Sequence, residues 1–173
     1  MLPGRLSAQA SDPRAAAAQA SREAMARFAW LEGEWEGPVT VSSSGRTFTL
    51  LQREAVQLSA MGTALIIQGR GTMRGSETAP ERLVFAAAGL LTFDVISNAY
   101  LFFSASGTGY AQQFTVTTYG SNGFVWGYTE PSGKQMRYVI SRTPNGEWYE
   151  LGEQSSDGTV WSKTLEMTLV KKR

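Results

Sequence analysis

Four arginines lie inside segments of the sequence that alternate as strands do: Arg53, Arg70, Arg137 and Arg142. An arginine that points into a barrel can hold the carboxylate of an amphipathic ligand, because its planar guanidinium matches that group with two hydrogen bonds. An arginine on a solvated outer face is the alternative for each of them. Arg70 lies between two glycines, which suits close packing. Arg137 has the parity opposite to the apolar residues of its segment, which favours an outer position.

Aromatic side chains are frequent in the same strand-like segments. They line ligand cavities in many proteins, but they also fill ordinary cores. A residue that offers apolar area together with a polar handle suits an interior pocket best. We therefore predict that the following residues lie at or beside an interior ligand pocket: Trp35, Arg70, Trp126, Tyr138 and Trp161.

The chain contains no histidine and no cysteine. Their absence excludes Ser-His-Asp hydrolysis, thiol nucleophiles, disulfides and cysteine-based zinc sites, and it removes the usual axial ligands of haem. Glu147, Glu150 and Glu153 precede Asp157, and a carboxylate pair can serve acid–base chemistry. A solvated hairpin tip explains these residues more simply. We therefore predict no catalytic residue, no metal site and no cofactor.

Composition and charge further narrow the classes of function that the protein can have. The 173 residues suit one domain with a sizeable core. Lys and Arg number 16 against 15 Asp and Glu, which leaves a net charge of +1. That balance offers no basis for binding nucleic acid. No run of apolar residues is long enough for a transmembrane helix.

The first residues of the chain bear on localisation. Residues 1–11 are predicted to be disordered, and within them Ala8-Gln9-Ala10 has the small-x-small pattern of a signal-peptide cleavage site. A periplasmic or secreted protein with a truncated signal is one interpretation. A cytoplasmic protein with a polar, Ala-rich tail is the other, and the sequence leaves the compartment open.

A single helix is predicted near the N-terminus, before the strands begin. Asp12 followed by a proline is a typical helix start, and residues 13–27 have high helix propensity. The helix carries few large apolar side chains until its C-terminal end. We expect Met25, Phe28 and Leu31 to cover one end of a barrel. Residues 1–27 are thus assigned as a polar tail and an Ala-rich helix, and residues 28–170 as a single β-barrel domain.

After this helix the sequence is patterned almost wholly as strands, separated by short segments rich in Gly, Asn, Ser and Pro. The predicted strands are 35–43, 46–58, 62–71, 82–94, 99–105, 110–119, 123–130, 134–143, 146–155 and 159–170. The longest link, residues 72–81, could act as a lid. About ten consecutive antiparallel strands either close into a barrel or split into a sandwich, and closure removes the edge strands.

Alternation within two segments indicates what faces inward. In the segment 159–170, Trp161, Leu165, Met167 and Leu169 share one face. In the segment 110–119, the face that contains Phe114 is only partly apolar. Mixed inner faces of that kind are common where a barrel encloses a cavity.

Several motifs resemble those of small uncharacterised bacterial lipocalin-like proteins, a family of calycin-type barrels. Residues 31–37 read Leu-Glu-Gly-Glu-Trp-Glu-Gly, matching a Leu-x-Gly-x-Trp-x-Gly motif that follows a helix. Residues 148–158 match a Trp-x-Glu-x-Gly-x-x-Ser-x-Asp-Gly hairpin, and Trp161 and residues 166–169 continue that ending. The segment 62–71 also fits, so the resemblance extends from about residue 28 to residue 169.

The resemblance implies an all-β, antiparallel, lipocalin-like barrel of about ten strands with an N-terminal helix, but no established activity. In lipocalins the last strand normally supplies an arginine that packs on the first-strand tryptophan. In this sequence the last predicted strand offers only Lys163, with Lys171 and Lys172 beyond it. A related haem-binding barrel family uses an axial histidine, which this chain lacks.

The function predicted from the sequence is non-enzymatic binding of a small apolar or amphipathic molecule inside the barrel. Two alternatives remain open. One is an enzyme that uses Tyr, Glu or Arg in a polar barrel interior, which requires two convergent ionisable groups at inward positions. The other is a structural or assembly protein, with a homodimer as one form.

Overall fold

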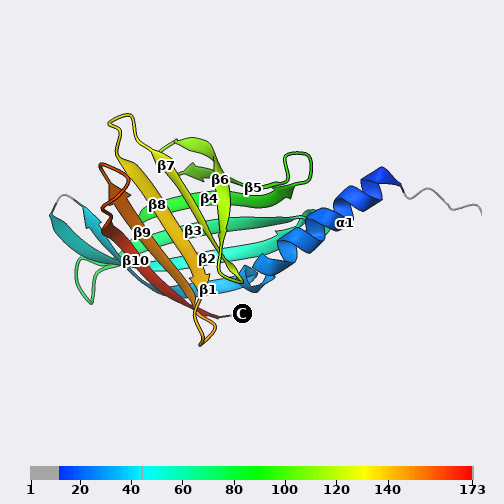
Figure 1. Cartoon of the computed structure of the whole chain (residues 1–173). Helices are drawn as coiled ribbons and strands as arrows, with labels where there is room; N and C mark the ends of the chain where they lie inside the picture. The colour runs from blue at the N-terminus through cyan, green and yellow to red at the C-terminus, as the bar shows by residue number, and fades with distance from the viewer. Residues whose placement is uncertain (1–11, 44, 173) are drawn as a thin grey trace, which may run out of the picture.

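In the computed structural model, ten antiparallel strands form a closed barrel, and one α-helix extends from the end at which the chain enters it (Figure 1). The structure describes residues 12–43 and 45–172, so the Ala8-Gln9-Ala10 pattern lies outside the described residues. The helices are α1 Pro13–Met25 and the short 3-10 helices η1 Ala26–Leu31 and η2 Ala60–Gly62. The strands are β1 Gly33–Ser43, β2 Arg46–Ser59, β3 Ala64–Met73, β4 Arg82–Asp94, β5 Ala99–Ser106, β6 Ala111–Tyr119, β7 Gly123–Thr129, β8 Gln135–Arg142, β9 Trp148–Ser155 and β10 Ser162–Lys171.

The predicted fold class is confirmed, and each predicted strand corresponds to one strand of the barrel. Consecutive strands are hydrogen-bonded neighbours, and β1 closes the barrel by pairing with β10 as well as with β2. Val39 on β1, for example, lies opposite Leu50 on β2 and Met167 on β10. Turn glycines make the tight reversals: Gly146 and Gly158 adopt φ values of 85° and 76° between β8, β9 and β10.

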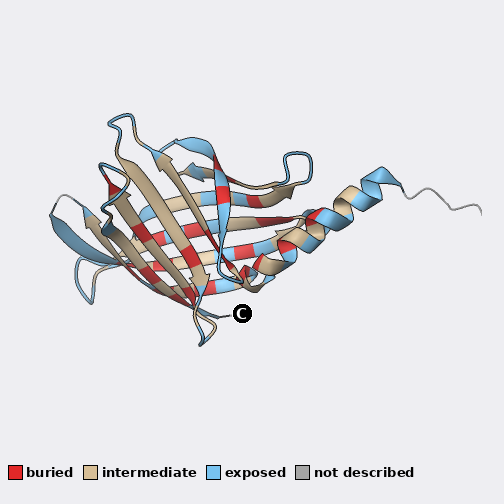
Figure 2. Ribbon diagram, in the orientation of Figure 1, coloured by how far each residue is buried: buried red, intermediate tan, exposed pale blue. Residues whose placement is uncertain are grey.

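The end of the barrel next to α1 is closed by apolar side chains, as the sequence predicts. Asp12 caps α1 by accepting a hydrogen bond from the backbone N–H of Arg14 at 3.0 Å. The exposed first turns of α1 project beyond the barrel, and burial begins toward its C-terminal end (Figure 2). Met25, Phe28 and Leu31 are each at most 1% exposed. Together they cover this end of the barrel, called the floor below.

Phe28 is the central residue of the floor. Its ring meets Tyr100 of β5 and Phe124 of β7 edge to face, at centroid distances of 5.1 and 5.2 Å. The helix is attached about two turns earlier by the Ser21 hydroxyl, which donates to the backbone oxygen of Phe93 at 3.1 Å. The floor therefore joins the helix to strands from one half of the barrel.

Trp35 completes the floor at the start of β1. Its indole N–H donates to the backbone oxygen of Leu31 at 2.7 Å, and its ring packs edge to face with Trp30 and Trp148. The Lys171 ammonium lies 5.3 Å from the centroid of the Trp35 ring. β10 extends to Lys171, so the last strand does supply a cation to this tryptophan, in a position that the shorter predicted strand did not include.

No helix in residues 12–43 and 45–172 has both the length and the apolar character needed to cross a membrane.

Candidate functional site

The barrel encloses a cavity of about 890 Å³ between the floor and the opposite end. Its walls come from strands β2 to β10, and its outer rim includes Tyr110, Glu130 and Pro131 in the connections β5–β6 and β7–β8. Tyr110 is 81% exposed, so the rim borders solvent. Residues 72–81, the long link considered as a lid, contribute no residue to the lining of this cavity. A volume in this range accommodates a small organic molecule.

Aromatic rings form the middle of the cavity wall. The rings of Trp126 on β7 and Tyr138 on β8 stack with centroids 4.4 Å apart and planes 15° from parallel. Phe114 and Phe102 pack against the Trp126 ring at 4.8 and 5.2 Å. We call these four residues the aromatic belt, and each of them lines the cavity.

Glycines at inward strand positions give these rings their room. A Cβ at Gly89 would lie 2.5 Å from the ring of Phe102, and a Cβ at Gly152 would lie 3.0 Å from the ring of Tyr138. Any side chain at either position would collide with an aromatic ring. The sequence thus places small residues where the inner wall must recede.

Two carboxyl groups lie at the deep end of the cavity. Glu54 on β2 and Glu150 on β9 both line it, each one inward position away from a buried floor residue, Val56 and Trp148 respectively. The Gln52 amide donates to Glu54 Oε1 at 2.6 Å. Gly69 on β3 lies opposite Glu54 in the register, where a Cβ would approach that oxygen to 2.6 Å. The barrel therefore makes space for a carboxyl group in its interior.

Burial changes the acidity of both groups. It raises the pKa of Glu54 to about 7, against the smaller opposing effect of the hydrogen bond from Gln52. Burial also raises the pKa of Glu150 to about 8, and repulsion from the Glu54 carboxylate contributes in the same direction. The Tyr138 hydroxyl is affected as well, since burial raises its pKa well above the usual range. Both carboxyl groups therefore keep their protons to a higher pH than a solvated glutamate does.

The indole N–H of Trp148, also at the deep end of the cavity, makes no hydrogen bond with the described residues. Trp148 is 4% exposed and lines the cavity, yet no acceptor among the described residues is aligned with its Nε1. The indole lies close enough to Glu150 to lower the pKa of that carboxyl slightly, but the geometry falls short of a hydrogen bond. A buried donor without an acceptor is uncommon and indicates a missing partner.

The charge inside the cavity has one sign. Its ionisable lining residues are carboxyl groups and tyrosines, and no Lys or Arg of the described chain lines it. No ion pair joins Glu54 or Glu150 to a cation within residues 12–43 and 45–172. The same residues contain no group of three or more acidic side chains arranged to hold a metal ion.

The structure distributes the five predicted site residues over three places. Trp126 and Tyr138 line the cavity, in the aromatic belt. Trp35 lies in the floor, where it supports the cavity-lining ring of Trp148. Arg70 and Trp161 lie outside the cavity lining. The Trp and Tyr of two neighbouring strands are thus the part of the prediction that converges on one pocket.

Trp161 is displaced because the strand register shifts. The pairing of β10 with β9 is irregular between Lys163 and Leu165, which leaves Thr164 as an extra residue. One extra residue reverses the parity of everything before it, so Trp161 no longer shares the inward face of Leu165. Its ring instead packs on the outer surface under the guanidinium of Arg137, 3.9 Å from the centroid.

Arg70 lies outside the cavity for a simpler reason: its neighbour Gly69 occupies the inward position on β3. Arg70 is consequently exposed on the outer face, opposite Arg53 of β2. The expectation that Arg70 lies at or beside the interior pocket, where it could hold the polar head of a ligand, does not agree with this placement. The outer position expected for Arg137 is confirmed by its 2.7 Å ion pair with Glu153.

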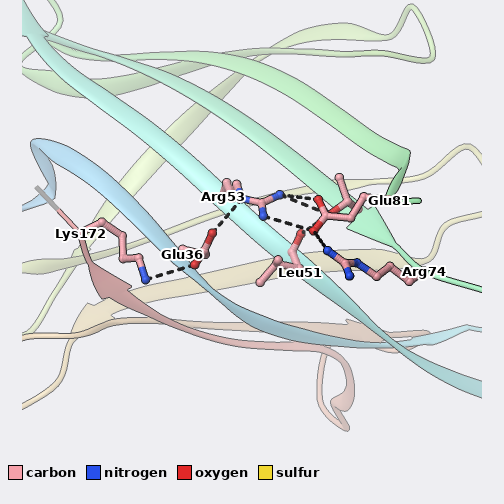
Figure 3. A network of polar contacts seen from close by, with 7 residues as sticks. Glu36, Leu51, Arg53, Arg74, Glu81 and Lys172 are labelled. Carbon is pink, nitrogen blue, oxygen red and sulfur yellow. Dashed lines mark hydrogen bonds and ion pairs between the residues drawn. The ribbon is translucent and has the colours of Figure 1, made fainter. Parts of the chain in front are cut away.

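Arg53 belongs to an ion-pair network on the outside of the barrel (Figure 3). Its guanidinium contacts Glu36 on β1 at 2.8 Å and Glu81 before β4 at 2.9 Å. Arg74 also pairs with Glu81, and Lys172 with Glu36. The network connects β1 and β2 to the β3–β4 link and to Lys172 after β10, and it pairs Arg53 with carboxylates on the outside of the barrel.

Sequence reasoning missed Glu54 and placed Glu150 at a solvated hairpin tip. The signal for both residues was their place in the inward–outward alternation of their strands. Glu54 alternates with Gln52 and Val56, and Glu150 alternates with Trp148 and Gly152, all of which face inward. A carboxyl group in such an alternation is easily dismissed, because charged side chains are seldom buried without a partner.

The comparisons with known proteins add a fold relationship. No protein-family model and no curated protein sequence matches the chain. A crystal structure of Rv2717c from M. tuberculosis superposes with a TM-score of 0.59, at 14% sequence identity, over 88% of this chain and 98% of that one. At this level of identity the likeness concerns the fold alone, and it is consistent with the β-barrel described above.

Proposed function

We propose that this protein binds a small apolar or amphipathic molecule inside its barrel and releases it chemically unchanged, as a lipocalin-like or calycin-type barrel. The observation that carries the proposal is the cavity of about 890 Å³, which is open at a rim of two loops and crossed by the aromatic belt. An ordinary barrel core of this size would be filled by side chains. Inward glycines at positions 69, 89 and 152 instead keep the wall recessed.

A cavity-filling variant tests this proposal. Ala87 lines the cavity, so Ala87→Phe is expected to occupy the space where a ligand would lie. The matched control is Ala105→Phe, which places the same side chain at an exposed strand position outside the cavity lining. Titration with the neutral dye Nile red should show saturable binding to the wild type and to Ala105→Phe, and weaker binding to Ala87→Phe. Equal dye binding by all three proteins would contradict the proposal.

Native mass spectrometry of protein purified from cells provides the second measurement. A co-purified small molecule that is lost in Ala87→Phe but kept in Ala105→Phe would support the proposal and identify the ligand chemistry. Dye binding to the surface alone would not produce such a species.

An enzyme is the second candidate, and one observation favours it. Glu54 and Glu150 are two ionisable groups that face the same cavity, with pKa values raised into the range in which general acids and bases work. The co-purified molecule decides between the candidates. Recovery of the same mass after prolonged incubation with the protein supports binding, whereas a product that disappears with Glu54→Gln or Glu150→Gln supports catalysis.

A further inference from the structure

We propose that the ligand of this barrel carries an organic cation, an amine or quaternary ammonium group on an apolar body, and that this group lies between Glu54 and Glu150 at the deep end of the cavity. The inference rests on the proposed ligand-binding function and specifies the charge and orientation of the ligand. It differs from the sequence-based expectation, which offered Arg70 as the residue for an anionic or polar head.

The first step concerns the sign of the charge. The deep end holds two carboxyl groups, and no Lys or Arg of the described residues lines the cavity. A carboxylate headgroup placed there would face two acids of its own sign without any cation to offset them. A positively charged group would be attracted by both, and the low dielectric of the interior would strengthen that attraction.

The second step concerns unsatisfied polar groups. Buried acids are normally paired with a cation or a set of hydrogen-bond donors. Among the described residues, Glu54 receives one amide donor from Gln52, whereas the indole N–H of Trp148 lies near Glu150 without forming a hydrogen bond. The Trp148 N–H makes no hydrogen bond among the described residues, so it does not complete the donor set of Glu150, and the cavity lining supplies no Lys or Arg to this carboxyl group.

The third step concerns the shape of the ligand. The aromatic belt lies along the cavity wall between the carboxyl groups and the rim, and the belt supplies ring faces and edges for an apolar body. Aromatic rings beside carboxylates are a combination that also favours quaternary ammonium groups, through the ring quadrupole. An amphipathic cation would thus point its head toward the floor and its apolar part toward the rim.

Four probes with the same tail separate headgroup charge from tail binding. Dodecyltrimethylammonium, dodecylamine, dodecanol and dodecanoate are titrated into the protein at concentrations at which each is monomeric. The proteins are the wild type, the double variant Glu54→Gln/Glu150→Gln, and the control Glu77→Gln, which changes an exposed acid outside the cavity. Glutamine keeps the shape of each side chain and removes its charge.

We expect the two cations to bind the wild type about tenfold or more tightly than dodecanol, and dodecanoate to bind most weakly. The double variant should lose this preference while its affinity for dodecanol stays within about twofold of the wild type. Glu77→Gln should behave as the wild type does. Circular dichroism and thermal unfolding of the double variant check that the barrel is intact.

Proton release gives an independent readout. A cation that pairs with the carboxyl groups should displace protons from them, so calorimetry at pH 7 in buffers of different ionisation enthalpy should show net proton release with dodecyltrimethylammonium. The other titratable groups that line the cavity are Tyr110, Tyr128, Tyr138 and Glu130. The release should be absent with dodecanol and absent in the double variant, which retains those four groups.

Each outcome has a definite meaning. Equal affinities for the cations and dodecanol, or tightest binding of dodecanoate, would overturn the cation inference while leaving the ligand-binding function in place. Failure of all four probes, together with failure of Nile red, would instead contradict the proposed function itself.

Discussion

The Glu54 carboxyl lies against the backbone of Gly69 on the neighbouring strand, so closely that a Cβ at Gly69 would be 2.6 Å from Glu54 Oε1. The two residues are register partners across β2 and β3. This relationship shows that the position of the carboxyl is built into the barrel wall, because only glycine leaves it room. The interior acid and the strand glycine therefore have to be considered as a pair.

The first prediction is that Gly69→Ala destabilises the protein by about 1–3 kcal/mol, because the new methyl group forces the Glu54 side chain to shift within a confined space. The loss should be smaller when Glu54 is already alanine, so a double-mutant cycle should give a coupling energy of at least about 0.5 kcal/mol. Urea denaturation measures both. Gly75→Ala is the control, since a Cβ at Gly75 meets no atom within 4 Å. Additive effects of Gly69→Ala and Glu54→Ala would show that the carboxyl is not held where the structure places it.

The second prediction concerns pH. The pKa values of Glu54 and Glu150 are raised from 4.5 to about 7 and about 8, so the folded protein binds these protons more tightly than the unfolded chain does. The resulting stabilisation is fully present below about pH 4.5 and is lost as pH rises through 7 and 8. The free energy of unfolding should therefore fall between about pH 5 and pH 8.5 in the ligand-free protein.

The chain has no histidine, so no imidazole group titrates in the pH range 5 to 8.5 and contributes to this change in stability. Acids with lowered pKa values act elsewhere: the ion pair with Arg53 lowers the pKa of Glu81 to about 2, so its contribution is lost only as pH falls below 4.5. Urea denaturation at half-unit pH steps measures the curve. Glu54→Gln/Glu150→Gln should flatten it between pH 5 and 8.5, and an unchanged slope in that variant would contradict the assignment.

Trp126 gives the third prediction. Its ring stacks on Tyr138 and lines the cavity, so a ligand that enters the aromatic belt should change its emission. Trp126→Phe should remove most of the ligand-induced change in tryptophan fluorescence, whereas Trp161→Phe should retain it because Trp161 packs on the outer surface with Arg137. The reverse result would place the ligand on the outer surface beside Trp161.

The outcomes for Trp161 and Glu150 show how far sequence patterning extends. Turn chemistry and alternation predicted every strand to within a few residues, because these signals act locally. A single extra residue at Thr164 then reversed the face of Trp161, and nothing in the local pattern announces such a bulge.

The interior acids were missed for a different reason. Their presence contradicts the general preference for exposed charge, and only closure of the barrel brings β2 and β9 around one cavity. Parity placed Glu150 on the same face as Trp148, but the cost of burying an unpaired carboxyl argued against that interpretation. Sites that violate the local rules are where function is most often found.

The last prediction concerns the floor. Phe28 is fully buried and packs edge to face on Tyr100 and Phe124, so Phe28→Ala should cost about 3–5 kcal/mol of stability. Residues 12–16 are exposed, so deletion of residues 1–16 should lower the free energy of unfolding by no more than about 1 kcal/mol, the typical effect of losing an N-cap such as Asp12. The tolerated deletion should end before Ser21, because the buried Ser21 hydroxyl bonds to Phe93, and extension through that residue should begin to destabilise the barrel. Thermal and urea unfolding of the two truncations and of Phe28→Ala measure this order. A large loss on removing residues 1–16 would mean that the exposed turns of α1 pack on another surface, such as a second copy of the chain.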